Sequence, residues 1–289
     1  MRAFPLRSGA RIPAVGVALA PSADALFAHA RAALLAGAPR LDGSGAVASA
    51  RELARALDDH GDCGHAGADG ADGCPFVSWR LATVDAAEPR RAVSALHAVL
   101  AALPVDRLDL VLVPWVASGH GAHGPAIVSI GATLSALRAD GRAAAVGVID
   151  APARALDVLA RAGLLPDVVE AALDPRHPAA ALVAACSERD VHLTASAPLG
   201  PDVHFDGNGR AHGGILDHPV VREVADRLAV SPAQALLAWN LTRGVSVSSP
   251  AATPAKILRH LDTPHVVLAR ADVAALDTLA GGRAQAAVA

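Results

Sequence analysis

The chain has 289 residues and a formal net charge of −3 at pH 7; 53% of its residues are hydrophobic but only 2% are aromatic. It contains no tyrosine, which excludes any mechanism that needs a tyrosine phenol. All 25 basic residues except Lys256 are arginine, and they form no basic stripe, so we expect no nucleic-acid partner.

Short apolar runs recur along the chain, and longer Ala- and Leu-rich stretches with helical periodicity lie between them. The runs predict eight strands, at Ala14–Leu19, Pro39–Asp42, Phe76–Leu81, Asp109–Val113, Ala144–Ile149, Asp167–Ala171, Val191–Ala195 and Val245–Ser248. The stretches predict helices, among them Ala48–Asp58, Pro89–Leu103, Ile127–Ala139, Pro152–Ala162, Ala179–Arg189, Pro219–Leu228 and Ala271–Leu279.

This alternation predicts a parallel sheet covered by helices. Eight such units in fewer than 300 residues favour a (β/α)8 barrel, one domain spanning residues 1–289. A doubly wound sheet is the competing architecture. Against it, no Gly-x-Gly-x-x-Gly motif follows an early strand, and the Gly-rich segment Gly61–Gly73 is irregular. In a barrel, the functional groups are expected at the carboxyl ends of the strands.

Three cysteines are too few for a disulfide framework, and nothing in the composition indicates secretion. The first 20 residues lack the continuous apolar core of a signal peptide. No apolar run reaches the ~18 residues of a membrane span. We therefore expect a cytoplasmic protein with no membrane contact.

Seven segments at the predicted strand ends follow one another in a specific order: Gly9–Gly16, Arg40–Asp42, Phe76–Leu81, Leu108–Trp115, Ala145–Asp150, Leu193–Gly200 and Ser231–Asn240. The first resembles the opening hairpin and first strand of the aldo-keto reductase family. The others resemble, in turn, that family's H-I-D-T-A, F-V-T-S-K-L, I-D-L-Y-L-I-H-W, S-I-G-V-S-N, V-A-Y-S-P-L-G and T-P-A-Q-V-A-L-R-W-N segments. The resemblance implies an α/β fold, a TIM barrel with an N-terminal β-hairpin.

Members of this family reduce carbonyls with NADPH through a tetrad of Asp, Tyr, Lys and His, and the tyrosine is the proton donor. Carried over by the resemblance, the Asp is Asp42, but the Tyr falls on Val47, the Lys on Arg80 and the His on Pro114. Trp115 is retained after Pro114. Only one of the four tetrad residues is present.

The positions that the family uses for its nicotinamide cofactor also differ. The Ser-Asn pair that holds the carboxamide is Ile149-Asp150, the following Gln falls at about Val168, and the tyrosine that stacks on nicotinamide falls on Ser196. The P-K-S segment reads Ser249-Pro250-Ala251, and R-I-x-E-N reads Lys256–His260. Because hydride transfer needs the nicotinamide, we expect no cofactor and no ordinary reductase activity.

Without a cofactor, the carboxyl end of the barrel is predicted to be a deep cleft suited to a bulky apolar ligand. Its expected apolar wall is Leu19, Ala20, Val47, Pro114, Ile149 and Ala197, with Trp79 and Trp115 as aromatic surfaces and Asp42, Arg80, Asp150, Ser196 and Ser248 as polar groups. Trp115 could contact the ligand or pack under the following loop. Asp150 could act as a base at the rim or cap the helix beginning near Pro152.

An Asp42–Arg80 pair on adjacent strands is the sharpest candidate for catalysis. It could polarise a carbonyl or position a carboxylate. Alternatively, it is an inherited buried ion pair that persists because removal of one partner strands the other.

Three loops carry further polar residues. The segment from His60 to Cys74 contains metal-ligating residue types, but its spacing matches no tetrahedral zinc site, so we predict no metal. His120 and His123 lie in a Gly/His loop that could be solvated or contact a ligand. The segment Pro201–Gly214, with His204, could act as a lid that contacts substrate.

The joint loss of tetrad and cofactor residues favours a cofactor-independent cyclase, isomerase or lyase of specialised metabolism, with Asp42 and Arg80 as catalytic residues. Its substrate would be a large, mainly apolar molecule, and the protein a monomer or weak homodimer. One alternative is a noncatalytic pseudoenzyme that binds a ligand or partner protein. Another is an NADPH-dependent carbonyl reductase with a relocated proton donor.

Overall fold

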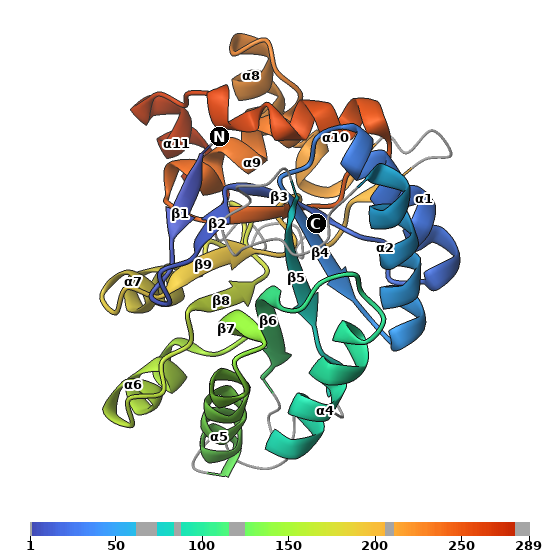
Figure 1. Ribbon diagram of the computed structural model, residues 1–289. Helices are drawn as coiled ribbons and strands as arrows, with labels where there is room; N and C mark the ends of the chain where they lie inside the picture. The colour runs from blue at the N-terminus through green and yellow to red at the C-terminus, as the bar shows by residue number, and fades with distance from the viewer. Residues whose placement is uncertain (1, 62–73, 84–87, 116–124, 206–210, 281–289) are drawn as a thin grey trace.

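Eight parallel strands form a closed barrel in the order β12-β3-β4-β5-β6-β7-β8-β9 (Figure 1). The computed structural model describes residues 2–61, 74–83, 88–115, 125–205 and 211–280. The strands are β3 (Val15–Ala18), β4 (Arg40–Ser44), β5 (Phe76–Arg80), β6 (Leu108–Pro114), β7 (Ala143–Ile149), β8 (Val168–Ala171), β9 (His192–Ala195) and β12 (Ser246–Ser249). All eight predicted strands are confirmed, and because β12 pairs with both β3 and β9, the doubly wound alternative is excluded.

Helices surround the barrel (Figure 1). They are α1 (Ala23–Leu35), α2 (Val47–His60), α4 (Pro89–Leu100), α5 (Pro125–Asp140), α6 (Ala153–Arg161), α7 (Ala180–Ser187), α8 (Pro219–Arg227), α9 (Pro232–Thr242), α10 (Pro254–Leu261) and α11 (Arg270–Asp277), with 3-10 turns η1 (Gly214–Asp217) and η2 (Thr263–His265). Five of them, α4, α5, α8, α9 and α10, begin at a proline, whose fixed φ suits the first helical position. Among the described residues, no helix is long and apolar enough to cross a membrane.

The start of α9 shows how the sequence fixes a helix end. The Ser231 hydroxyl accepts the Gln234 backbone N–H at 3.3 Å, and the Gln234 side chain accepts the Ser231 N–H at 3.2 Å. This capping box satisfies two backbone donors that a helix start leaves open. Further along α9, the fully buried Trp239 donates its indole N–H to Asp277 of α11 at 2.8 Å.

An N-terminal hairpin, β1 (Ala3–Pro5) and β2 (Arg11–Pro13), confirms the predicted hairpin. Its residues Leu6, Ala10 and Ile12 form a small apolar cluster with side chains of β5, β6, β7 and β8. A second small hairpin pairs β10 (His204–Phe205) with β11 (Ala211–His212).

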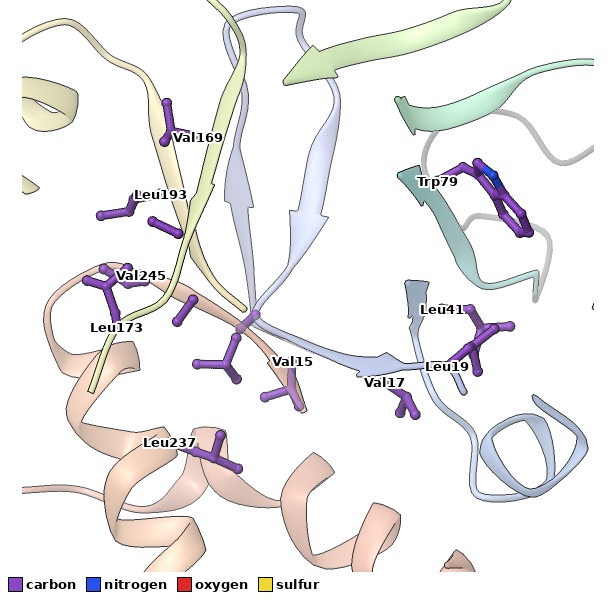
Figure 2. Packing of buried hydrophobic residues seen from close by; sticks show 14 of the residues in the cluster. Val15, Val17, Leu19, Leu41, Trp79, Val169, Leu173, Leu193, Leu237 and Val245 are labelled. Atoms are coloured by element: carbon purple, nitrogen blue, oxygen red, sulfur yellow. The ribbon is translucent and has the colours of Figure 1, made fainter. Parts of the chain in front are cut away.

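The main core lies between the strands and the surrounding helices. Figure 2 shows Val15 and Val17 on one side of β3, in the same buried cluster as Leu19, Leu41 and Trp79. Because successive strand residues point to opposite faces, the residues between them face the barrel interior. On β5, Val77 and Trp79 therefore belong to the outer core, whereas Ser78 and Arg80 point inward.

Gly16 of β3 leaves room for polar side chains inside the barrel. A Cβ atom on Gly16 would lie 2.6 Å from Oδ2 of Asp42, and it would also clash with the Arg40 guanidinium. Glycine is required here by close side-chain approach, not by a left-handed backbone.

We predict that Gly16→Ala lowers the free energy of unfolding by about 1–3 kcal/mol, because the extra methyl overpacks a rigid site. Urea denaturation measures the change. Gly141→Ala is the matched control: Gly141 has open space but a φ of +76°, so it isolates backbone strain. A stable Gly16→Ala protein with unchanged unfolding would contradict the crowding at Gly16.

Candidate active site

Polar side chains line the interior of the barrel from the amino ends of its strands, where Arg40 and Ser246 lie, to the carboxyl ends, where Arg80 and Glu170 lie. They come from five strands that are not all neighbours in the sequence: Arg40 and Asp42 of β4, Ser78 and Arg80 of β5, Glu170 of β8, His192 and Thr194 of β9, and Ser246 and Ser248 of β12. Inward-facing positions two residues apart on a strand account for this grouping. The interior is therefore more highly charged than the cleft prediction, which expected few polar groups there.

Asp42 is held from three sides. Ser78 donates to its Oδ1 at 2.6 Å, Ser248 donates to its Oδ2 at 2.6 Å, and Nε of Arg40 lies 3.0 Å from Oδ1. Burial alone would raise the pKa of Asp42, but the charges of Arg40 and Arg80 and the two hydroxyl bonds outweigh it, so the pKa is lowered. Asp42 is a fixed, buried carboxylate.

Arg40 is the ion-pair partner of Asp42 and is completely buried. Its guanidinium also donates to the carbonyl oxygens of Pro13 at 2.9 Å and Val247 at 2.8 Å. The sequence pattern gave Arg40 no role beyond its place in the strand segment Arg40–Asp42. Its position two residues before Asp42, on the same face of one strand, is the signal that could have identified the pair.

The predicted direct Asp42–Arg80 pair is wrong. Arg80 instead forms a two-pronged ion pair with Glu170, from Nε to Oε1 at 2.7 Å and from Nη2 to Oε2 at 2.9 Å. Ser248 joins the two pairs, because it accepts from Nη2 of Arg80 at 3.3 Å and donates to Asp42. The reason is that Arg40 lies beside Asp42 on the same strand, whereas Arg80 lies beside Glu170 of β8 across the barrel, so each arginine pairs with a different carboxylate.

Glu170 was not predicted. The family resemblance placed a glutamine position at about Val168, which in the structure is a fully buried apolar residue inside the barrel. Glu170 lies two residues further along β8 and faces the same way, nearer the carboxyl end. A single glutamate within the apolar run Val168–Ala171 is the signal that could have revealed it.

The electrostatics of the Arg80–Glu170 pair are set by burial. Removal from water raises the pKa of Glu170, and this outweighs the opposing effect of Arg80. For Arg80, burial lowers the pKa, but the charges of Glu170 and Asp42 raise it by more than burial lowers it, so the guanidinium stays charged. The charges of Arg40, Asp42, Arg80 and Glu170 sum to zero.

Two predicted cleft residues lie in the outer core. Leu19 is 6% exposed and packs in the same cluster as Leu41 (Figure 2). Trp79 is fully buried, and its ring packs over Gly43, where a Cβ would lie 2.5 Å away. Their placement at the barrel mouth is wrong because each lies on the strand face that points toward the helices.

Val47, the first residue of α2, is half-buried. Together with Trp79 it lines a cavity of about 450 Å³ bounded by Leu81 and by Ala95 and Val99 of α4. Val47 therefore contributes to a space between α2, β5 and α4, alongside the outer-core residue Trp79.

Other predicted residues do lie at the carboxyl ends of strands. Pro114 and Trp115 are half-buried at the end of β6, and the backbone N–H of Trp115 donates to the Ile149 carbonyl at 2.9 Å. Trp115 also packs against the main core. The loop that follows it lies outside the described residues, so packing under that loop stays a prediction. Ser196 is half-buried after β9.

Asp150 is exposed directly after β7, in a left-handed conformation with φ of 56°. Its N–H donates to the Glu170 carbonyl at 2.7 Å, and partial loss of its water shell raises its pKa. The described N-cap of α6 is Pro152, with no side-chain cap bond, so the prediction that Asp150 caps this helix is not confirmed.

The predicted loop residues lie mostly outside the described residues. Residues 62–73, which contain most of the metal-type segment, and His120 and His123 are among those not described. His204 is described only as a backbone position of β10, paired with His212. Within the described part of the chain, no cluster of three metal-ligating side chains occurs.

A separate cavity of about 510 Å³ lies between η1, α8, α9 and α10. Basic and acidic side chains both line it: His212, Asp217, Arg222, Asp226, Lys256, Arg259 and His260. His260 is 7% exposed, and its Nδ1 lies 2.6 Å from the Ser249 hydroxyl. Burial first, and then the charges of Lys256 and Arg259, lower the pKa of His260 to about 4.

The fold and the charged interior define a (β/α)8 barrel protein in which the Arg80–Glu170 pair lies at the carboxyl ends of the strands, where enzymes of this architecture place their active sites. Comparisons with known proteins agree. Residues 48–280 match the model of the Aldo/keto reductase family. An aldo-keto reductase of Mycolicibacterium vanbaalenii is 30% identical over 273 residues, which cover 94% of this chain and 89% of the relative. The chain belongs to the aldo-keto reductase family.

Other relatives agree with this assignment. A glycerol 2-dehydrogenase (NADP(+)) of Hypocrea jecorina is 30% identical over 200 residues, covering 63% of this chain and 61% of that protein. An aldo/keto reductase from Brucella melitensis shares the fold with a TM-score of 0.80 at 22% identity, covering 96% of this chain and 99% of that one. An aldo-keto reductase complexed with NADPH gives a TM-score of 0.81 at 18% identity, covering 97% and 88%.

The residues that the resemblance assigns to the nicotinamide and those that it assigns to the adenosine phosphate differ in how well they fit the NADPH that the family uses. At the nicotinamide end, Asp150 presents a carboxylate and Ser196 offers no ring for stacking. At the other end, the 510 Å³ cavity contains Lys256 and Arg259. The residues at the reacting end therefore do not fit a bound nicotinamide.

The Arg40–Asp42 pair supports a stability prediction. We expect Arg40→Met to lower the free energy of unfolding by about 3–5 kcal/mol, because Asp42 is left as a buried, unpaired charge. The double variant Arg40→Met/Asp42→Leu should recover part of this loss. Urea denaturation tests both, and Arg55→Met, in an exposed pair with Glu52, should cost no more than about 1 kcal/mol. Equal losses in the single and double variants would contradict the pairing.

The buried His260 predicts a pH dependence of stability. Its folded pKa of about 4 lies below the ordinary 6.5, so between these values the unfolded chain binds more protons than the folded one. Stability should be complete above pH 6.5 and fall by about 1.4 kcal/mol per pH unit as the pH drops toward 4. His260→Gln should flatten this slope by that amount in urea melts at several pH values, whereas His265→Gln, on an exposed imidazole, should leave it unchanged.

Proposed function

We propose that this aldo-keto reductase family member is a non-redox enzyme, a cyclase, isomerase or lyase, that acts on a large apolar molecule at the carboxyl ends of its barrel strands. The observation that carries the proposal is the Arg80–Glu170 ion pair. It occupies the barrel end with two charged groups, while Val47 stands where the resemblance expects the proton-donating tyrosine and Pro114 where it expects the histidine.

Arg80 is the group best suited to touch the substrate. Its side chain is 19% exposed, compared with 4% for Asp42 and 0% for Arg40. Asp42 is surrounded by donors from Arg40, Ser78 and Ser248, so we assign it the role of positioning Ser248, which in turn contacts Arg80. Catalysis would rest on substrate orientation and on hydrogen bonds from Arg80.

We propose further that the enzyme works in the cytoplasm, as a monomer or weak homodimer, on a small molecule and without nucleic-acid partners. The expectation of no nucleic-acid partner is based on the charge distribution of the sequence, which contains no basic stripe.

The 510 Å³ cavity that contains Lys256 and Arg259, called the basic cavity below, favours a second candidate function. This candidate is an NADPH-dependent carbonyl reductase with a relocated proton donor. Lys256 and Arg259 could hold a phosphate there, although Asp217 and Asp226 in the same lining oppose an anion. This candidate requires the nicotinamide to be held without the groups that the resemblance assigns to it.

Cofactor titration separates the two candidates. We expect NADPH to bind the purified protein no more tightly than about 100 µM, and no more tightly than 2′,5′-ADP, because the nicotinamide end adds no favourable contact. Calorimetry measures both ligands, with Lys256→Ala/Arg259→Ala as the control for any binding in the basic cavity. Micromolar NADPH binding, or NADPH oxidation with a panel of aldehydes, would overturn the non-redox proposal in favour of the reductase.

A further inference from the structure

The Arg80–Glu170 pair has hydrogen-bonding capacity that its neighbours do not use. We infer that this pair is a proton-transfer site: Arg80 binds the oxygen of a ketone and Glu170 removes and returns the proton of an adjacent C–H bond. The inference deepens the proposed non-redox function and rests on it. It narrows the substrate class to apolar molecules with a ketone next to a C–H group, and the reaction to isomerisation.

The guanidinium of Arg80 is held at one edge and open at its end. Nε and Nη2 bind the two oxygens of Glu170, and Nη2 also lies 3.3 Å from the Ser248 hydroxyl. No described residue forms a hydrogen bond to Nη1. Because the guanidinium is planar, the N–H groups of Nη1 point away from the Glu170 carboxylate. The partly exposed side chain can therefore offer this end to an incoming oxygen.

Glu170 keeps proton-accepting capacity within the pair. Each carboxylate oxygen accepts one bond from Arg80, which leaves a second lone pair on each. The side chain is only 3% exposed, so little water competes for these lone pairs. Its raised pKa, caused mainly by burial, brings its proton affinity closer to what a general base needs near neutral pH.

The charge balance of the network suits this step. The C–H bond breaks, its proton bonds to a Glu170 oxygen, and its electron pair forms the C=C bond of an enolate as the carbonyl electrons move to oxygen. Glu170 becomes neutral while the substrate oxygen becomes negative, so Arg80 exchanges one anionic partner for another. The proton then returns to the same carbon or to a conjugated one, and no oxidant or reductant is consumed.

The same balance argues against a carboxylate substrate. Arg80 is already neutralised by Glu170, and Arg40 by Asp42. An anionic substrate would bring a fifth charge into a largely buried network whose charges sum to zero, at a desolvation cost that nothing repays. A neutral ketone adds no charge until the proton has moved.

Deuterium exchange tests the inference without cofactor. The full chain is incubated in D2O with 2-decalone or cyclododecanone, and loss of the C–H signals next to the ketone is followed by proton NMR. We expect exchange above the buffer rate with the wild-type protein. We expect Glu170→Gln to reduce it by about 100-fold or more and Arg80→Lys by about tenfold or more.

Two further variants guard against a folding artefact. Glu170→Asp keeps a carboxylate on a shorter side chain and should retain measurable exchange, and Glu188→Gln, an exposed glutamate on the far end of α7, should match the wild type. Circular dichroism confirms that each variant is folded. No exchange by the wild type, or equal exchange by folded Glu170→Gln, would overturn the inference. Neither result involves NADPH, so the cofactor titration continues to test the non-redox proposal separately.

Discussion

The arrangement inside the barrel depends on one buried charge, the guanidinium of Arg40. It is completely buried, and a strand carbonyl or carboxylate meets each of its sides. Asp42 must be ionised to balance it, Gly16 must lack a side chain to make room for both, and Ser78 and Ser248 must aim their hydroxyls at Asp42. A buried pair of this kind contributes little net stability but constrains which neighbours are tolerated.

The second pair is tied to the first through Ser248, and this link determines what the carboxyl end of the barrel can do. Ser248 uses its proton on Asp42 and its oxygen on Arg80. The orientation of Arg80 is therefore fixed directly by Glu170 and, through Ser248, by Asp42. The resemblance places Val47 at the position of the family's proton-donating tyrosine, and the described barrel end contains a network of fixed charges. These two features are the basis for proposing different chemistry.

The fold could be predicted from the sequence, but the pairing within the site could not. The alternation of apolar strands and helices repeats eight times along the chain, so an uncertain boundary at one strand does not change the prediction for the others. The bounds of all eight strands were predicted to within about two residues. Partner choice depends on distances across the barrel, and Arg80 meets Glu170 from a strand 90 residues away. Strand parity could have excluded Trp79, because it lies between the inward-facing Ser78 and Arg80.

The burial of the tryptophans has a practical consequence for anyone studying ligand binding. Trp79 and Trp239 are fully buried in the core, and the chain has no tyrosine. The half-buried Trp115, next to Ile149, is therefore the tryptophan whose fluorescence should respond to a ligand at the barrel end. Intrinsic fluorescence should thus contain a constant, blue-shifted background and a variable contribution from one position. A Trp115→Phe protein would supply the blank against which occupancy of the barrel end is read directly.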